Sequence, residues 1–238
     1  MLKAFSSRVQ GIKYLLTHPH QLKWVINREI YFGGRKKSKK NWVEWQKYDA
    51  KMHIMMMQAH AETLSINVLN VDRIKIFVDM IIKIGSNLKI LDVGCGDGVI
   101  SEPILKMGNY IASVELPVVA TFSKKCNVSS IMAGDAETLA YAQESFDLVI
   151  ASEVLEHLWE PQSFLGEAYR VLKPNGCLII ETPEGKMGLN YDSHRHFFTV
   201  ELLKDILSPK FELNEVKRLD ATGSAQTPTI ILLLHKVA

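Results

Sequence analysis

The feature that most constrains this chain is the run of nine residues from Ile90 to Gly98, in which an apolar stretch breaks into a turn with three alternate glycines. The apolar half is typical of a buried strand, and the glycines let the backbone bend sharply and approach a ligand closely. Strands that end in such a turn bind nucleotide-like molecules in α/β folds. The run therefore predicts an α/β domain with a nucleotide-like cofactor.

The pattern after this turn predicts a doubly wound sheet. Short apolar runs alternate with helix-like segments, which is the signature of parallel βαβ units. The expected strands lie near residues 88–93, 110–115, 129–133, 146–151, 176–181, 211–219 and 228–235. Because the last two are close in sequence, we expect them to pair as a hairpin at the edge of a seven-stranded, mostly parallel sheet. Ligands should then collect at the carboxyl ends of the strands.

The N-terminal part of the chain has a different pattern. Its apolar residues recur at intervals of three and four, which predicts a helical N-terminal extension or lid over 1–85, before a cofactor-binding domain over 86–238.

The charge of the chain is unevenly distributed. Residues 1–51 hold 12 Lys or Arg against 3 acids, a net charge of +9, whereas residues 52–238 hold 16 Lys or Arg against 23 acids, a net charge of −7. The densest basic run, Arg35 to Lys40, is a candidate surface for nucleic acid, and a solvated loop is the alternative.

Carboxylates accompany the first three expected strands. Glu115 ends the second strand, where it can accept hydrogen bonds from both ribose hydroxyls of a cofactor. Asp135 ends the third strand, where a ligand role competes with capping a helix over 137–142. Asp92 precedes the glycines, and a carboxylate suits the positive charges of S-adenosylmethionine (AdoMet) better than the pyrophosphate of NAD. The glycine spacing also departs from the NAD fingerprint, because Val99 fills the position of its last glycine.

Taken in order, these motifs resemble those of class I AdoMet-dependent methyltransferases over roughly residues 86–236. The segments that carry the resemblance are Asp92–Gly98, Ala112–Glu115, Gly134–Glu137, Phe146–His157 and Arg170–Gly176. The resemblance implies the Rossmann-like methyltransferase fold, with AdoMet as the cofactor and Asp135 on its adenine amino group. The AdoMet-binding residues that it implies are Asp92, Gly94, Cys95, Gly96, Gly98, Glu115, Asp135, Ala136 and Ser152.

A second group of polar residues follows the fourth and fifth expected strands. Glu153, Glu156 and His157 are spaced i, i+3 and i+4, which would place them on one face of a helix beside the cofactor. His194 and His196 come after the fifth strand and belong to the same edge. Two carboxylates with one or two imidazoles can form an octahedral site for Mg²⁺. The alternative is a metal-free site in which one histidine is the general base.

This second group resembles the corresponding residues of ubiquinone-pathway O-methyltransferases and of small-RNA terminal 2'-O-methyltransferases. The resemblance implies that Mg²⁺ is bound by Glu153, Glu156, His157 and His194, with His196 as an alternate ligand. The segment from His194 to Thr199 also resembles metal-free methyltransferases, so the fourth ligand stays open. The expected catalytic residues are His157, His194, His196 and Glu153.

The activity expected from these residues is O-methylation of a small-molecule or sugar-like acceptor by in-line displacement, with histidine or metal assistance. An oxygen acceptor is favoured because Ser152 and Glu153 stand where an Asn-Pro-Pro-Tyr-type motif for amine methylation would lie. The alternatives are an RNA ribose 2'-O-methyltransferase, a non-catalytic AdoMet-binding partner or scaffold subunit, and an NAD-dependent oxidoreductase. The chain has no apolar run of transmembrane length and no secretory signal pattern, so we expect a cytoplasmic protein.

Overall fold

The computed structural model describes residues 68–125, 130–185, 194–220 and 228–237, together with residues 40, 42, 44, 46, 47 and 54. The strands are β1 (Lys89–Val93), β2 (Tyr110–Glu115), β3 (Ile131–Ala133), β4 (Phe146–Ser152), β5 (Leu172–Pro183), β6 (Phe211–Leu219) and β7 (Thr229–Lys236). The helices are α4 (Val68–Ile84), α5 (Ser101–Lys106), α6 (Pro117–Lys125), the 3₁₀ helix η2 (Leu155–His157), α7 (Pro161–Val171) and α8 (Val200–Leu207).

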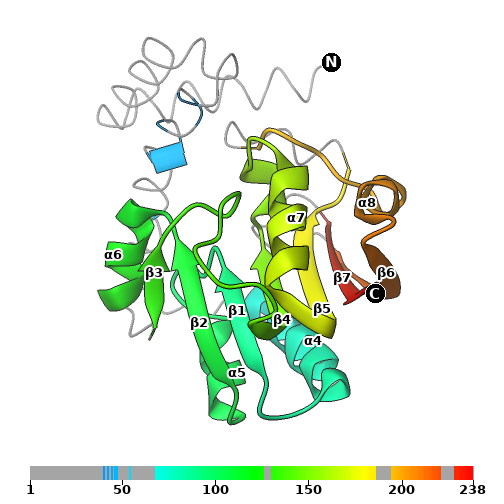
Figure 1. Ribbon diagram of the computed structural model, residues 1–238, viewed down its shortest axis with the longest axis horizontal. Helices are drawn as coiled ribbons and strands as arrows, with labels where there is room; N and C mark the ends of the chain where they lie inside the picture. Colours follow the sequence, from blue (N-terminus) through cyan, green and yellow to red (C-terminus); the bar gives the residue numbers. More distant parts are fainter. Residues whose placement is uncertain are drawn as a thin grey trace. The chain divides into compact units, whose positions relative to one another are not determined.

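The strands form one seven-stranded sheet in the order β3-β2-β1-β4-β5-β7-β6 (Figure 1). All neighbouring pairs from β3 to β5 are parallel, whereas β7 runs antiparallel to both β5 and β6. The strand order reverses between β1 and β4, which makes their carboxyl ends the expected ligand site of a doubly wound sheet. The fold predicted from the sequence is confirmed, including the hairpin of the last two strands at one edge.

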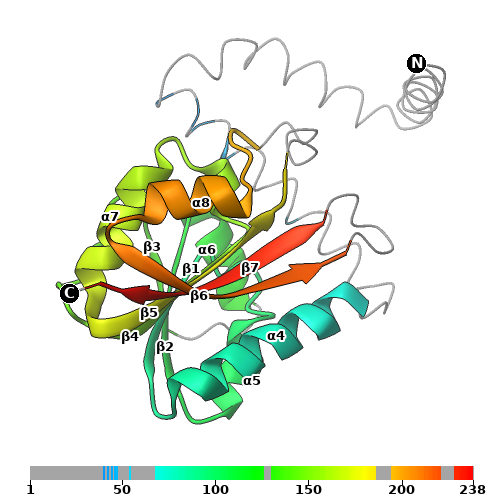
Figure 2. The same cartoon turned by 90° about the vertical axis from the view of Figure 1, so that its right-hand side faces the viewer.

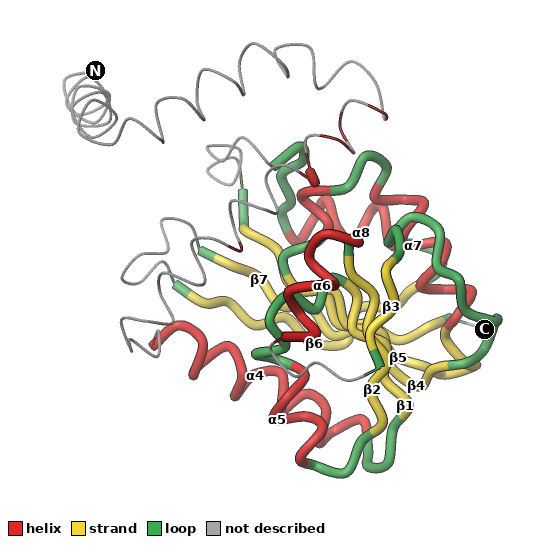
Figure 3. The backbone as a smooth tube through the Cα atoms, turned by 90° about the vertical axis from the view of Figure 1, so that its left-hand side faces the viewer, coloured by secondary structure: helices red, strands yellow, loops and turns green. Residues whose placement is uncertain are grey.

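The sheet is covered on both faces, and its strands alternate between two hydrophobic layers, as the period of two requires (Figures 2 and 3). One layer packs under α7 and α8 and includes Leu91, Val93, Val149, Ala151, Leu178 and Ile180. The other layer packs under α4 and α5 and includes Ile90, Leu148, Ile150, Cys177 and Ile179. Because both faces of the sheet are buried, the sequences of these strands are continuous apolar runs.

Helix α4 belongs to the core of the sheet domain, although it lies within the stretch expected to form an extension. Its buried residues Phe77, Met80 and Ile81 follow helical spacing and join the second layer. The chain separates into two compact units, residues 1–45 and 46–238. The boundary expected at residues 85 and 86 stays a prediction.

Two further sequence expectations concern the N-terminal region and the membrane. Of the basic run from Arg35 to Lys40, only Lys40 lies within the described residues, so its role as a nucleic-acid surface stays a prediction. None of the helices in the described part of the chain is long and apolar enough to cross a membrane.

The helix expected over 137–142 is wrong. The chain makes a turn there instead, with an isolated bridge between Asp135 and Thr138. The Oδ1 atom of Asp135 accepts the N–H of Glu137 at 2.9 Å, and the N–H of Leu139 donates to Glu167 on α7 at 2.7 Å. The carbonyls of Leu139 and Tyr141 accept hydrogen bonds from Arg170 on α7 at 2.8 Å and 2.7 Å, so this segment is bonded to α7 and not within a helix of its own.

Candidate functional site

The glycine-rich turn after β1 is held against β2 and against the segment that follows β4. Gly94 has a φ of +75°, and its N–H donates to the carbonyl of Val114 at 2.8 Å. A Cβ atom at this position would lie 2.4 Å from Cγ2 of Val154. Only glycine fits, for reasons of both backbone conformation and space.

Gly94→Ala is therefore expected to destabilise the protein by about 2–5 kcal/mol, through left-handed strain together with overpacking. Gly108→Ala is the matched control, since Gly108 has a φ of +85° and a Cβ there would meet nothing within 4 Å. The control should lose only the strain, about 1–2 kcal/mol. Urea unfolding of both variants measures the difference, and equal losses would show that the Val154 contact is unimportant.

The turn is tied to Glu115 at the end of β2. The N–H of Gly96 donates to Glu115 Oε2 at 3.1 Å, and the N–H of Leu116 donates to Oε1 at 2.7 Å. Burial raises the pKa of Glu115, and the two hydrogen bonds oppose that rise. A Cβ at Gly96 would meet no atom within 4 Å, so the turn is open beside this carboxylate. A carboxylate has about four acceptor positions, which leaves room for the two hydroxyls of a ribose.

Asp92 lies beneath the turn and is 3% exposed. Its Oδ2 atom accepts a hydrogen bond from Ser101 Oγ at the start of α5. Burial raises the pKa of Asp92 to about 6, and the Ser101 hydrogen bond offsets part of that rise. The neighbouring thiol of Cys95 is also buried, and both burial and the charge of Asp92 raise its pKa. Cys95 therefore stays a thiol at neutral pH.

The raised pKa of Asp92 predicts a measurable cost to stability. An acid whose pKa is higher in the folded state stabilises the fold when protonated, and this contribution is lost as the pH rises from about 4 through about 6. Asp92→Asn should therefore stabilise the ligand-free protein at pH 7.5 by up to about 3 kcal/mol. Denaturation of both proteins between pH 4 and pH 8 tests this. The gain should vanish near pH 4, and a gain that is constant with pH would contradict the account.

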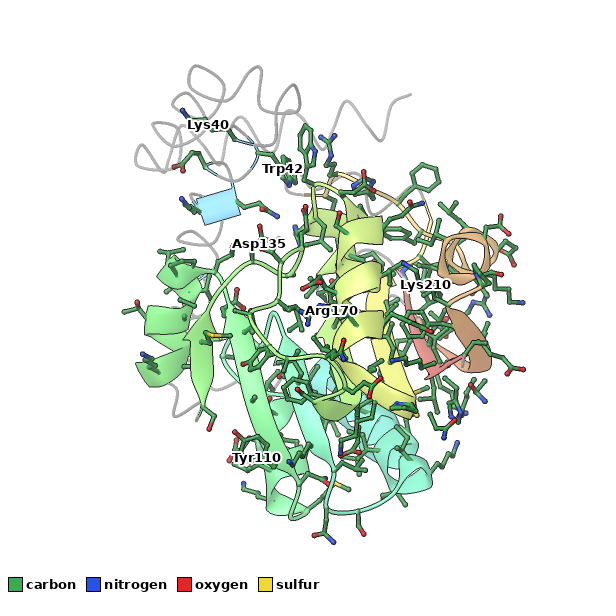
Figure 4. All side chains as sticks on the ribbon, viewed as in Figure 1. Lys40, Trp42, Tyr110, Asp135, Arg170 and Lys210 are labelled. Atoms are coloured by element: carbon green, nitrogen blue, oxygen red, sulfur yellow. The ribbon has the colours of Figure 1, made fainter. Side chains whose placement is uncertain are left out.

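Asp135 and Ala136 follow the end of β3, on the same edge of the sheet as the glycine turn. Figure 4 shows Asp135 at this edge, whereas Tyr110 marks the opposite end of the neighbouring strand β2. Asp135 is half-buried. Its side chain accepts one N–H from the backbone of its own turn, which fixes the carboxylate at the rim.

The residues after β4 do not lie on a helical face, so that expectation is wrong. Glu153 has a φ of +55°, and its N–H donates to the carbonyl of Glu181 on β5 at 2.9 Å. A single 3₁₀ turn follows, and the helix α7 begins only at Pro161. This geometry turns Glu156 into the protein, where it is 1% exposed. Glu153 stays half-buried at the sheet edge.

Three of the predicted polar residues meet at this point. The ligand atoms of Glu156, His157 and His194 all lie within 4.8 Å of one another. The imidazoles of His157 and His194 meet edge to face, with ring centroids 4.8 Å apart. Thr182 Oγ1 donates to Glu156 Oε2 at 3.0 Å, whereas Glu156 Oε1 is buried with no hydrogen-bond partner. Burial raises the pKa of Glu156 well above its usual range, and the charge of Glu153 adds to the rise.

His196 has a different environment from His194. Its Nε2 atom lies 3.0 Å from the carbonyl oxygen of Leu158, and its ring lies beside that of Phe198. Burial lowers the pKa of His196. His196 is not part of the group that Glu156, His157 and His194 form among the described residues.

Two functional candidates were missed from the sequence. Arg73 on α4 has its Nε 2.7 Å from Glu181 Oε1, and its Nη2 lies 3.9 Å from Glu153 Oε1. Glu181 is fully buried at the end of β5 and also accepts a hydrogen bond from Ser152 Oγ. An acid that ends an apolar strand was a usable signal for Glu181. No local pattern connects Arg73 with it, because they are far apart in the sequence.

The comparisons with known proteins agree with this geometry. Residues 91–180 match a family model described as a methyltransferase domain. The fold, the order of the motifs and this match identify residues 91–180 as a class I AdoMet-dependent methyltransferase domain.

Curated relatives match a similar part of the chain. A ubiquinone biosynthesis O-methyltransferase of Azorhizobium caulinodans is 39% identical over 101 residues, which is 40% of this chain and 40% of that protein. The enzyme of the same name from Ruegeria pomeroyi is 35% identical over 103 residues, 41% of this chain and 42% of that protein. The matched stretch thus spans about two fifths of these relatives.

Solved structures share the fold over a longer stretch. The N-methyltransferase NodS from Bradyrhizobium japonicum, in complex with S-adenosyl-L-homocysteine, has a TM-score of 0.61 and 19% identity, covering 74% of this chain and 91% of that one. The [4+2]-cyclase SpnF has a TM-score of 0.55 and 19% identity, covering 63% of this chain and 75% of that one. The fold therefore hosts different reactions, and the acceptor must be argued from the site.

Proposed function

We propose that this protein transfers the methyl group of AdoMet to an oxygen atom of a small-molecule or sugar-like acceptor. The observation that carries the proposal is the meeting of two groups at one edge of the sheet. The open glycine turn with Glu115 suits the cofactor, and the cluster of Glu156, His157 and His194 follows the adjacent strands. The relatives named as O-methyltransferases support an oxygen acceptor.

The residues at the glycine turn fit AdoMet. Glu115 would accept the ribose hydroxyls, and Asp135 would accept the adenine amino group while the N–H of Ala136 meets the ring. Asp92 would balance the ammonium group, which would also offset the cost of burying its charge. Bound AdoMet supplies an activated methyl group on a positively charged sulfur. The remaining task of the protein is to align the acceptor and to remove or mask its proton.

The proton of the acceptor would be taken by the second group. Burial and the charge of Glu181 raise the pKa of Glu153 to about 7, which suits a group that exchanges protons near neutral pH. Among the residues that the structure describes, the imidazoles of His157 and His194 are the other candidate proton acceptors of this second group. The ion pair between the buried Glu181 and the half-buried Arg73 fixes the backbone at Glu153, because Glu181 binds Arg73 through its side chain and Glu153 through its carbonyl.

The same group fits a divalent cation, and Mg²⁺, which prefers oxygen ligands, would take water or acceptor oxygens in addition. The Glu156 oxygen that accepts no hydrogen bond lies 3.8 Å from His157 Nε2, and one carboxylate with two imidazoles is a donor set that divalent transition metals accept. Glu156, His157 and His194 would hold the ion, whereas Glu153, which the sequence also predicted as a ligand, is not part of this group among the described residues and lies 3.9 Å from Arg73. A bound Mg²⁺ would lower the pKa of an acceptor hydroxyl and fix its position.

A screen of acceptor classes with labelled AdoMet tests the proposed activity. Catechols and phenols, sugars and nucleotide sugars, and short RNA are incubated with the protein, with added Mg²⁺ and with a chelator. We expect label to appear on an oxygen of a catechol, phenol or sugar. Label on RNA alone would contradict the small-molecule acceptor, and label on nitrogen would contradict the oxygen acceptor. A rate unchanged by the chelator would leave the histidines and Glu153 as the candidate proton acceptors among the described residues.

A further inference from the structure

The segment between β3 and β4 is attached to α7 by charged side chains. Glu167 Oε2 accepts the N–H of Leu139 at 2.7 Å, and Arg170 Nη2 donates to the carbonyl of the same residue at 2.8 Å. Arg170 Nη1 donates to the carbonyl of Tyr141 at 2.7 Å, and Figure 4 shows Arg170 beside this segment. The later half of the segment is therefore fixed to α7, independently of any ligand at Asp135.

The earlier half of the segment makes a different connection, through Glu137. The Glu137 side chain is 6% exposed, and its Oε1 atom accepts the N–H of Trp159 at 2.7 Å and the N–H of Glu160 at 3.2 Å. These amides belong to residues 158–160, which connect η2 to α7 and directly follow Glu156 and His157. A single buried carboxylate oxygen thus links the segment that begins at Asp135 to the turn that carries the proposed catalytic group.

The same turn is held from its other side by the segment that carries His194. The N–H groups of Arg195 and His196 both donate to the carbonyl of Glu156, at 2.7 Å and 3.3 Å. The Arg195 guanidinium lies 3.8 Å from the centre of the Trp159 ring. The turn is therefore fixed between two segments, and Glu137 is its connection to the cofactor side.

We propose that Glu137 is a positioning residue that couples the occupation of the adenine site at Asp135 to the geometry of the 156–160 turn. The inference rests on the proposed function, because it takes AdoMet as the ligand at Asp135. The N–H of Glu137 donates to Asp135 itself, so a ligand that fixes Asp135 also fixes the backbone of Glu137. Its carboxylate then fixes the amides of Trp159 and Glu160. Such coupling is reciprocal, so an ordered turn also favours cofactor binding.

Amide hydrogen exchange on the full chain, with and without AdoMet, tests this proposal. The variants are Glu137→Ala and the milder Glu137→Gln, which keeps the size of the side chain if the alanine variant does not fold. Glu144→Gln is the matched control, because it makes the same charge change at an exposed position of the same segment. In the wild type and the control, AdoMet should slow exchange at the amides of Trp159 and Glu160.

In Glu137→Ala, exchange at these two amides should be at least roughly tenfold faster, because two hydrogen bonds to a charged acceptor are lost. AdoMet should no longer slow it, while exchange in β4 and β5 should not change. Equal slowing by AdoMet in the wild type and the variants would overturn the coupling, as would faster exchange throughout the sheet. Calorimetry on the same samples separates the two proposals. If AdoMet does not bind the wild type, the proposed function fails and the coupling fails with it.

Discussion

Replacing Glu115 by glutamine is expected to weaken AdoMet binding on the order of 100-fold or more. Two charge-assisted hydrogen bonds to the ribose hydroxyls would be lost or weakened, at about 1.5–3 kcal/mol each. The substitution also removes the charge that accepts the N–H of Gly96, so the glycine turn loses its support from β2. Titration calorimetry of the variant with AdoMet measures the effect directly.

Glu102→Gln is the matched control for this experiment. Glu102 lies on the neighbouring helix α5, its side chain is 69% exposed, and it forms a surface ion pair with Lys106. Since exposed pairs of this kind contribute little, the control should bind AdoMet like the wild type. If Glu115→Gln binds AdoMet within a few-fold of the control, the ribose does not lie at Glu115 and the cofactor placement is wrong.

The second large effect is expected at Glu156. Glu156→Gln should lower the rate of methyl transfer on the order of 100-fold or more, because Glu156 is one of the three groups proposed to hold the cation and a neutral amide is a weaker ligand. The affinity for AdoMet should change by less than about threefold. The variant should fold normally, because burial raises the pKa of Glu156 and a neutral amide of the same size suits that environment. The measurement is a single-turnover assay with the acceptor that the screen identifies.

Glu160→Gln provides the comparison for Glu156, because Glu160 lies in the same turn but is exposed. Its rate should match that of the wild type. A Glu156→Gln variant that keeps its full transfer rate would exclude Glu156 as a ligand of a cation that the reaction requires. A variant that loses both transfer and stability would show that the buried carboxylate has a structural role instead.

Much of the backbone geometry around the glycine turn could be predicted because its signals are local. The glycines at positions 94, 96 and 98, and the acid that ends β2, depend on backbone conformation and strand position, which short sequence patterns encode. The hairpin of β6 and β7 was predictable for the same reason. Parallel strands buried on both faces leave continuous apolar runs that locate the sheet.

The arrangement of the residues after β4 was predicted less well because tertiary contacts decide it. The spacing of Glu153, Glu156 and His157 suggested a helix, yet the turn follows a left-handed residue and hydrogen bonds to β5. Arg73 reaches the site from α4, and Glu137 reaches it from the β3–β4 segment. Such connections between distant residues leave no periodic signal in a single sequence.

The most direct test of the whole account is titration calorimetry of the unmodified protein with AdoMet, with NAD as the competing nucleotide. AdoMet should bind saturably at one site, Glu115→Gln should weaken that binding on the order of 100-fold or more, and NAD should not bind. Binding of NAD without AdoMet, or binding of AdoMet that Glu115→Gln leaves unchanged, would contradict the account.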